Sequence, residues 1–331
     1  MFELVHGLRS AAALAGAALA AWLPGGPAHA QEGFPSRSIN LIVPFAPGGS
    51  TDVIARVIAE AMRPSLGQSV IVDNRAGAGG STGTAATAKA ALDGYAIGMG
   101  TASTLAINPA VYRNLAYDVA KDLEPITNLA VVPNIMAIHA GQPAQDMGQF
   151  VALLKTQPGK LSYGSSGVGS VSHLMGEQFK MATGTDMAHV PYRGIGPALN
   201  DAVGGHIQVM FDNLPTTLPM VEAGKLRAMA VSSAKRLPAL PDVPTFAELK
   251  MDELDWVAFF GLVAPAGTPP PVIKRIWNAA SVALDQADVK DKLVAQQAVP
   301  VGNSPEAFRA EITRELARHK RAVAAANIKV D

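Results

Sequence analysis

Short apolar runs alternate with segments of helical periodicity along the first third of the chain. Residues 39–43 are mostly apolar, which is typical of a buried strand, and the apolar positions of 53–62 fall on one helical face. Further strands are predicted at 70–72 and 96–99, with an Ala-rich helix over 82–92 between them. Strands that alternate with helices predict a parallel sheet with helices on its faces.

The same succession of elements recurs in the rest of the chain. Two later helices have start signals, Pro269 before one and Pro305 before the other. The other predicted elements are strands over 160–163, 187–190, 207–211 and 226–231, and helices over 170–181 and 197–203. This pattern predicts the α/β fold class, with two α/β lobes.

Two extended segments, 130–138 and 256–264, are interpreted as crossings between the lobes. Lobe 1 then comprises residues 31–131 and 255–331 and is discontinuous, whereas lobe 2 comprises residues 132–254. Both ends of the mature chain belong to lobe 1 in this interpretation.

The N-terminus has the layout of an export signal. Residues 11–23 form an apolar stretch, a Pro-Gly-Gly-Pro break follows at 24–27, and Ala28-His29-Ala30 is an A-x-A cleavage pattern. A membrane anchor is the alternative, but the stretch is shorter than the roughly 20 residues that a span needs. We therefore predict a signal peptide over residues 1–30, cleavage after Ala30 and a soluble periplasmic product.

The composition narrows the range of functions. The chain has 331 residues with 27 basic and 27 acidic ones, and this balance argues against nucleic-acid binding, which favours a basic excess. The absence of cysteine excludes disulfides, thiolate zinc sites and iron–sulfur clusters. The seven histidines are scattered, so no metal site and no cofactor are expected.

A glycine-containing loop at residues 44–52 joins the first predicted strand to the first predicted helix. Its glycines allow a ligand to approach the backbone closely, and Ser50 or Thr51 is expected to cap the helix. The free N–H groups of a first helical turn and the helix dipole together form an anion site. The alternative is a tight structural turn with a satisfied cap.

A second loop, residues 164–173, also joins a strand to a helix and carries four serine hydroxyls. If the lobes face each other, the two loops direct two helix N-termini into one cleft, which suits a small ligand with two separated carboxylates. Charge-assisted hydrogen bonds of roughly 1.5–3 kcal/mol each reach micromolar binding without an arginine. We expect Gly49→Val and Ser170→Leu each to weaken binding at least about tenfold.

Other polar residues have less specific interpretations. Residues 100–104 follow the third strand and are expected at the same sheet edge as the first loop. Asp212 follows another strand, where it accepts from a ligand ammonium, orients a water or caps a turn. His173 and Glu177 are one helical turn apart, which is typical of a surface contact. The glycine-rich loop 73–80 is interpreted as structural and is expected at the opposite edge from the first loop.

Motifs of several enzyme classes are absent from the sequence. There is no Walker loop, dinucleotide fingerprint or H-E-x-x-H motif, and a nucleophile elbow fails because Val168 stands where its last glycine belongs. A periplasmic hydrolase remains an alternative, with Ser166 or Ser170 as nucleophile, because Ser166, His173 and Asp212 can converge in space as a triad.

Many motifs in order along the mature chain resemble those of a known family. In the first half they are PFAPGG at 44–49, DNR at 73–75, GAGG at 77–80, DGY at 93–95 and INP at 107–109. In the second half they are SSGVGS at 165–170, HVPY at 189–192, FDN at 211–213, ALPDVPT at 239–245 and FGLVAPAGTP at 260–269. Together they resemble the Bug-type extracytoplasmic solute receptors of tripartite tricarboxylate transporters.

The resemblance implies a type II periplasmic-binding-protein fold, in which two lobes joined by two crossing strands close on a ligand. It implies a monomeric receptor without enzymatic activity that captures a di- or tricarboxylate, an acidic amino acid or an aromatic carboxylate. Delivery to membrane permease subunits follows, and presentation to a signalling protein is the alternative. The ligand-binding residues carried over are Phe45, Pro47, Gly48, Gly49, Thr101, Ser103, Ser165, Ser166, Ser170, His173 and Asp212.

Overall fold

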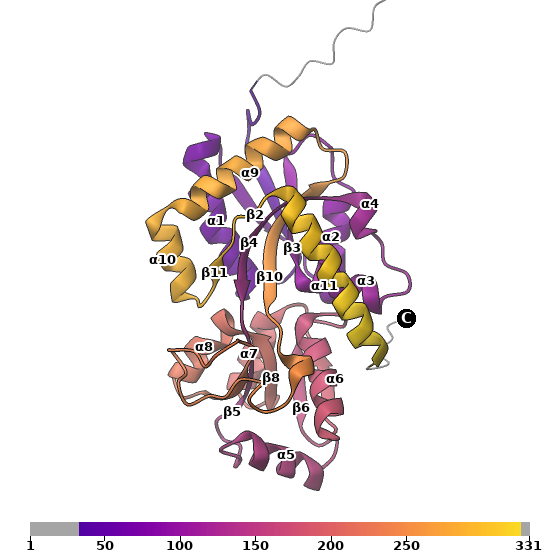
Figure 1. The fold of residues 1–331 in the computed structure, drawn as a ribbon, viewed down its shortest axis with the longest axis vertical. Coiled ribbons are helices and arrows are strands. Elements are labelled where there is room, and N and C mark those ends of the chain that lie inside the picture. Colours follow the sequence, from indigo (N-terminus) through magenta and orange to yellow (C-terminus); the bar gives the residue numbers. More distant parts are fainter. Residues whose placement is uncertain (1–32, 326–331) are drawn as a thin grey trace, which may run out of the picture. The chain divides into compact units, whose positions relative to one another are not determined.

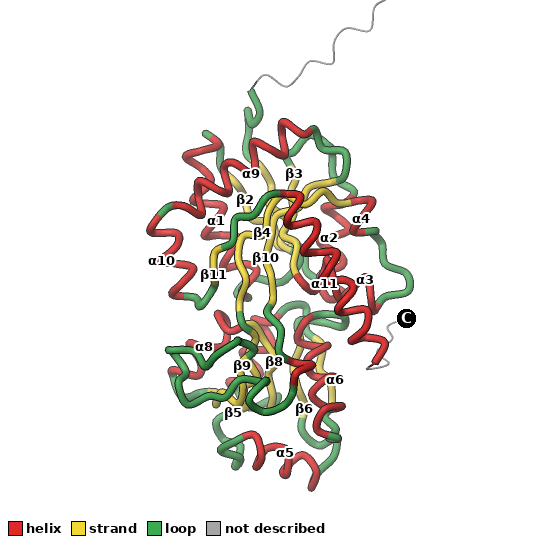
Figure 2. The backbone as a smooth tube through the Cα atoms, viewed as in Figure 1, coloured by secondary structure: helices red, strands yellow, loops and turns green. Residues whose placement is uncertain are grey.

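The computed structural model describes residues 33–325, so the predicted signal peptide and its cleavage after Ala30 lie outside the described residues. The described fold lies in one compact unit that begins at Pro35. This unit has two sheets, of six and five strands, each with packed helices (Figures 1 and 2). We call the part around the six-stranded sheet lobe 1 and the part around the five-stranded sheet lobe 2. The predicted two-lobed α/β fold class is confirmed.

Each lobe is a sheet with its own set of helices. The strands of lobe 1 are β1 (Ile39–Val43), β2 (Val70–Asn74), β3 (Ala96–Thr101), β4 (Leu123–Val132), β10 (Ala258–Pro265) and β11 (Val299–Pro300). Its helical segments are α1 (Ser50–Leu66), η1 (Ala78–Gly80), α2 (Ser81–Ala88), η2 (Ser103–Ile107), α3 (Asn108–Val111), α4 (Val119–Asp122), α9 (Pro270–Asp285), α10 (Ala287–Ala295) and α11 (Pro305–Ala325). Lobe 2 contains β5 (Asn134–His139), α5 (Met147–Thr156), β6 (Ser162–Ser165), α6 (Val171–Thr183), β7 (Ala188–Pro191), α7 (Ile195–Val203), β8 (Val209–Asn213), α8 (Leu214–Glu222) and β9 (Leu226–Val231), and the short turn η3 (Asp252–Leu254) precedes β10.

Both lobes arrange three of their strands in the same way. In lobe 1, β1 lies between β2 and β3 and pairs in parallel with both. In lobe 2, β6 lies between β7 and β8 and pairs in parallel with both. The connections that follow β1 and β3 in lobe 1, and those that follow β6 and β8 in lobe 2, therefore leave in opposite directions. This divergence creates a crevice at the carboxyl ends of each pair of strands.

The sheets are mixed, which corrects the prediction of purely parallel sheets. Strand β10 runs antiparallel to β3 and β4, and β5 runs antiparallel to β8 and β9. The predicted crossing 130–138 contains the end of β4 and most of β5, and the crossing 256–264 contains most of β10. Because β4 leads from lobe 1 to lobe 2 and β10 leads back, these two neighbouring strands have opposite directions (Figure 1).

Most predicted elements are confirmed to within a few residues. The strands at 39–43 and 226–231 have their predicted bounds, and β6 and β8 begin two residues later than predicted. The helix predicted over 82–92 ends earlier, at Ala88, and Leu92 is 50% exposed. Within the described residues, no helix has both the length and the apolar character needed to cross a membrane.

Candidate binding site between the lobes

A small cavity lies at the carboxyl ends of β1, β3, β6 and β8, where the two crevices face each other. Its volume is about 30 Å³, which accommodates only a few water molecules at about 10–15 Å³ each. Any organic solute therefore needs the lobes to move apart before it enters. The lining residues are Phe45, Gly49, Ser50, Thr51, Thr101, Ala102, Ser103, Ser166, Val171, Ser172, Ile195, Asp212, Asn213, Ala258, Phe259 and Phe260.

Helix α1 begins at this cavity without a side-chain cap. Its N-cap residue is Gly49, which has extended backbone angles and no side chain to accept a hydrogen bond. The first N–H groups of a helix have no partner inside the helix, and among the described residues none accepts from the N–H of Ser50 or Thr51. The first turn of α1 therefore presents unsatisfied donors and the positive end of the helix dipole to the cavity.

The expectation that Ser50 or Thr51 caps this helix is wrong. Both residues are already helical, because α1 begins at Ser50. The Ser50 hydroxyl instead lies 2.6 Å from Oγ1 of Thr216 in lobe 2. This hydrogen bond connects the lobes beside the cavity.

Helix α6 of lobe 2, in contrast, has a side-chain cap, and two N–H groups of its first turn have acceptors. Ser170 is its N-cap, and its hydroxyl accepts from the N–H of His173. The N–H of Val171 donates to Oγ of Ser103 in lobe 1 over 3.0 Å. Of the two helix N-termini that the sequence predicts at the cleft, α1 thus has no side-chain cap, whereas α6 is capped and donates the N–H groups of Val171 and His173 to serine hydroxyls.

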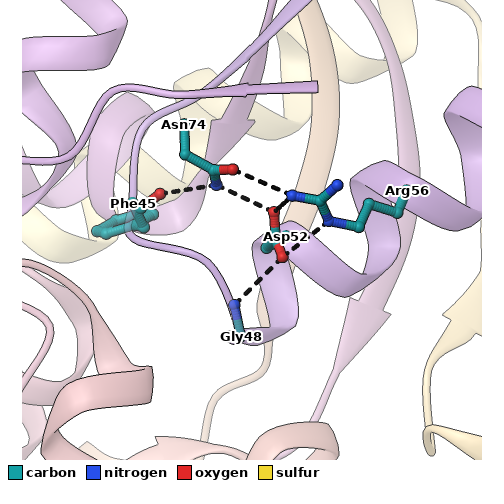
Figure 3. A network of polar contacts seen from close by, with 5 residues as sticks. All are labelled: Phe45, Gly48, Asp52, Arg56 and Asn74. Carbon is teal, nitrogen blue, oxygen red and sulfur yellow. Dashed lines mark hydrogen bonds and ion pairs between the residues drawn. The ribbon is translucent and has the colours of Figure 1, made fainter. Parts of the chain in front are cut away.

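Asp52, which is buried and pairs with the half-exposed Arg56, holds the first loop against α1 (Figure 3). The Asp52 carboxylate accepts two hydrogen bonds from Arg56, one from the N–H of Gly48 at 3.2 Å and one from Nδ2 of Asn74 at 3.0 Å. Burial opposes the charged form of Asp52, but the hydrogen bonds from Arg56, Asn74 and Gly48 outweigh it and lower the pKa of Asp52 below its usual value. Because Arg56 balances the charge of Asp52, the first turn of α1 keeps its attraction for an anion.

Loop 73–80 lies beside the first loop, and the prediction that it lies at the opposite edge is wrong. Nδ2 of Asn74 donates to the Phe45 carbonyl oxygen over 3.0 Å (Figure 3). The parallel pairing of β1 and β2 brings the carboxyl ends of both strands to the same edge. Further along this loop, Gly79 packs against the backbone of Val168 in lobe 2.

Other hydrogen bonds also join the lobes around the cavity. The Tyr112 hydroxyl donates to the Val168 carbonyl oxygen over 2.8 Å, and the N–H of Ala46 donates to the Arg193 carbonyl oxygen over 3.3 Å. With the Ser50 and Ser103 contacts described above, these bonds hold the lobes in a closed arrangement.

Six of the predicted ligand-binding residues line the cavity and five do not. Those that line it are Phe45, Gly49, Thr101, Ser103, Ser166 and Asp212. Those that do not are Pro47, Gly48, Ser165, Ser170 and His173. One of the latter, Ser165, makes a contact within its own lobe. It is fully buried, and its Oγ lies 2.6 Å from Nε2 of His189.

Several lining residues were not among those predicted. Ser50 and Thr51 follow the predicted glycines directly, so the helix start that the sequence predicts could have indicated them. The residues of β10, 258–260, lie in a predicted crossing, and a strand that joins two lobes is expected to pass their interface. Ile195 reaches the cavity from the start of α7, and no motif in the sequence indicates it.

The residues of the alternative catalytic triad do not form one. The Ser166 hydroxyl lies beside that of Ser172, Nδ1 of His173 accepts from a backbone N–H, and the Asp212 carboxyl accepts from Thr217. His173 is buried and stacks on His189, so the predicted surface contact is also wrong. Burial lowers the pKa of His173, and burial together with His173 and Lys180 lowers that of His189 to about 3. Within residues 33–325, no group of three or more acidic or histidine side chains is placed to hold a metal ion.

Comparison with known proteins places this architecture in a family. The family model described as "Tripartite tricarboxylate transporter family receptor" matches residues 54–328. The chain belongs to this family. Its members are solute receptors, so the hydrolase alternative is not supported. The receptor is 38% identical to protein BugT of Bordetella pertussis over 286 residues, which are 86% of this chain and 88% of BugT.

Two related proteins have solved structures that include a ligand. The receptor is 35% identical to Rpa4515 of R. palustris with adipate, with a TM-score of 0.85 over 89% of this chain and 99% of that one. It is 33% identical to MatC of Rhodopseudomonas palustris with bound malate, with a TM-score of 0.85 over 88% of this chain and 100% of that one. The fold of the receptor is thus that of solute-binding proteins of its family.

Ser170→Ala is expected to destabilise the receptor without weakening ligand binding. Loss of the α6 N-cap costs about 1 kcal/mol of unfolding free energy, whereas Ser170 does not line the cavity. The sequence-based expectation that Ser170 contacts the ligand predicts weaker binding instead. Urea unfolding and calorimetric titration check both effects, and a tenfold loss of affinity at unchanged stability would return Ser170 to the site.

Proposed function

We propose that this receptor captures a small organic anion in the cavity between its lobes, with a ligand carboxylate at the N-terminus of α1. The uncapped first turn of α1 carries this proposal, because Ser50 and Thr51 line the cavity and their N–H groups have no acceptor among the described residues. A carboxylate supplies the missing acceptors, and each charge-assisted hydrogen bond contributes about 1.5–3 kcal/mol.

The rest of the lining supports a carboxylate with a compact carbon skeleton. Neither lysine nor arginine occurs among the lining residues, so N–H groups, hydroxyls and the helix dipole meet the ligand's charge. Phe45, Ile195 and residues 258–260 of β10 make part of the lining apolar, which suits the carbon atoms of the ligand. We propose a di- or tricarboxylate, an acidic amino acid or an aromatic carboxylate, and the adipate and malate of the two related structures support the dicarboxylates in this range.

The ligand-binding residues that we propose are the six predicted residues that line the cavity, together with Ser50 and Thr51. We further propose the lobe boundaries given by the sequence, residues 31–131 with 255–331 and residues 132–254. The lobes would open and close about the junctions near these boundaries, as in other hinged binding proteins.

We also propose that the receptor is exported, cleaved after Ala30 and active as a monomer in the periplasm, where it delivers its ligand to the permease subunits of a tripartite transporter. The A-x-A pattern and the family support this route. The mass of the mature protein from a periplasmic extract tests the cleavage, with Gln31 expected as the first residue. Uptake of labelled ligand by cells with and without the receptor gene tests delivery, and separates transport from a sensor role.

Calorimetric titration against a panel of organic acids tests the binding function. The panel comprises adipate, malate, citrate, benzoate and glutamate, with the neutral diamide adipamide as the matched control for adipate. At least one acid is expected to bind with a Kd in the micromolar range, equivalent to about −8 kcal/mol, and adipamide is expected to give no heat of binding. Silence across the panel, or equal binding of adipate and adipamide, would contradict the proposal.

A further inference from the structure

Asp212 is the one ionisable side chain among the residues that line the cavity. It lies in β8, between β6 and β5 in the five-stranded sheet, and only 3% of its surface is exposed. Its Oδ2 accepts a hydrogen bond from the Thr217 hydroxyl over 2.8 Å, and the N–H of Asn213 is a second donor. No cationic side chain of the described residues forms an ion pair with it.

The neighbouring elements do not supply a charge that compensates Asp212. The ionisable residues on the elements packed against β8 are His139 on β5, Tyr163 on β6, His173, Glu177 and Lys180 on α6, Asp201 on α7 and Glu222 on α8. None of them contributes to the shift of the Asp212 pKa. Burial raises this pKa to about 7, although the hydrogen bonds from Thr217 and Asn213 act in the opposite direction.

An anionic ligand makes the charged form of Asp212 still less favourable. Two negative groups in a small cavity without a cation repel each other strongly, and one of them then binds a proton. The N–H donors at the start of α1 stabilise the ligand carboxylate as an anion, whereas Asp212 has no comparable set of donors around its carboxyl group. Protonation also turns the Asp212 carboxyl from an acceptor into a hydrogen-bond donor.

We propose that Asp212 binds the ligand as a neutral acid, donating a hydrogen bond to an acceptor oxygen at the ligand end that points away from α1. Capture of an organic anion then takes up a proton whenever Asp212 is ionised in the unliganded receptor. This inference rests on the proposed function and narrows its ligand class. The favoured ligands carry a second carboxylate, a carbonyl or a hydroxyl at that end, and an ammonium group there is disfavoured.

The protonation of Asp212 determines whether the ligand affinity rises or falls with pH. Above the pKa of Asp212 in the free receptor, each pH unit lowers the affinity for a dicarboxylate about tenfold, because one proton enters with the ligand. An ammonium that pairs with an ionised Asp212 gives the opposite slope. His173 and His189 stay neutral in this range, since both have lowered pKa values.

Titration calorimetry of the wild-type receptor at about pH 8, in buffers of different ionisation enthalpy, counts the protons. The probe is the dicarboxylate of the panel that binds most tightly. We expect an uptake of about one proton per ligand bound. Asp212→Asn keeps the shape of the side chain and an N–H donor, so it is expected to bind the same probe without proton uptake and with a pH-independent affinity.

The outcomes separate this inference from the proposed function. Binding without proton uptake in the wild type, or uptake that persists in Asp212→Asn, overturns the role of Asp212 and leaves anion capture intact. Silence of the whole organic-acid panel overturns both. The proton count of the wild type needs no variant, so a folding defect of Asp212→Asn does not remove the test.

Discussion

Replacing Ser50 with proline is expected to weaken the binding of an organic anion about 10- to 100-fold. Proline removes the N–H of the first helical residue, which is one of the donors at the cavity without an acceptor in the described chain. The helix tolerates the change, because proline is favoured at this position. Gly49 already has φ −91° and ψ 168°, the extended conformation that a residue before proline adopts.

Ser50→Ala is the matched control for this prediction. It removes the hydroxyl and the contact with Thr216, as proline does, but it keeps the N–H. Titration calorimetry is expected to give a much weaker affinity for the proline variant than for the alanine variant, with similar melting temperatures. Equal affinities would show that the ligand does not use this N–H group.

Gly79→Ala is expected to weaken ligand binding about 100-fold by preventing the lobes from closing. A Cβ at Gly79 would lie 2.1 Å from the carbonyl oxygen of Val168. This oxygen belongs to the backbone of the opposite lobe, so it cannot rotate away as a side chain does. The closed state that binds the ligand would then be a minor population, and the apparent affinity would fall with that population.

Gly184→Ala separates this effect from backbone strain. Gly79 has φ 59° and Gly184 has φ 61°, so alanine is similarly strained at both positions, at about 1–2 kcal/mol. Nothing lies within 4 Å of a Cβ at Gly184, which ends α6. Calorimetry is expected to show normal affinity for Gly184→Ala, and small-angle scattering with ligand is expected to show a more open Gly79→Ala. Equal affinities of the two variants would refute the lobe contact as the cause.

The periodicity of the sequence predicted the elements of the fold well, because burial on one face fixes the residue types there. The alternation of β1, α1, β2 and later elements indicated α/β lobes, and the loops after β1 and β6 do lie at one cavity. The antiparallel crossings were not predicted as sheet members. Which strands become neighbours depends on tertiary packing, and a short apolar run carries no signal of its partner.

The details of the site were harder to predict for the same reason. Ser50 and Thr51 are favoured capping residues, but the helix begins one residue earlier and Ser50 bonds to the other lobe. Ser170 does cap its helix, which removes it from the cavity lining. The burial of Asp212, which sets its pKa, comes from strands distant in sequence. Residue types therefore indicated the site, whereas the role of each donor required the three-dimensional arrangement.

A crystal structure of the receptor with a bound dicarboxylate shows whether the N-terminus of α1 holds a ligand carboxylate. We expect one ligand carboxylate within about 3.2 Å of the N–H groups of Ser50 and Thr51, with both lobes in contact with the ligand. A ligand bound outside the cavity, or held inside it without any contact to the first turn of α1, would show that this helix does not bind the anion.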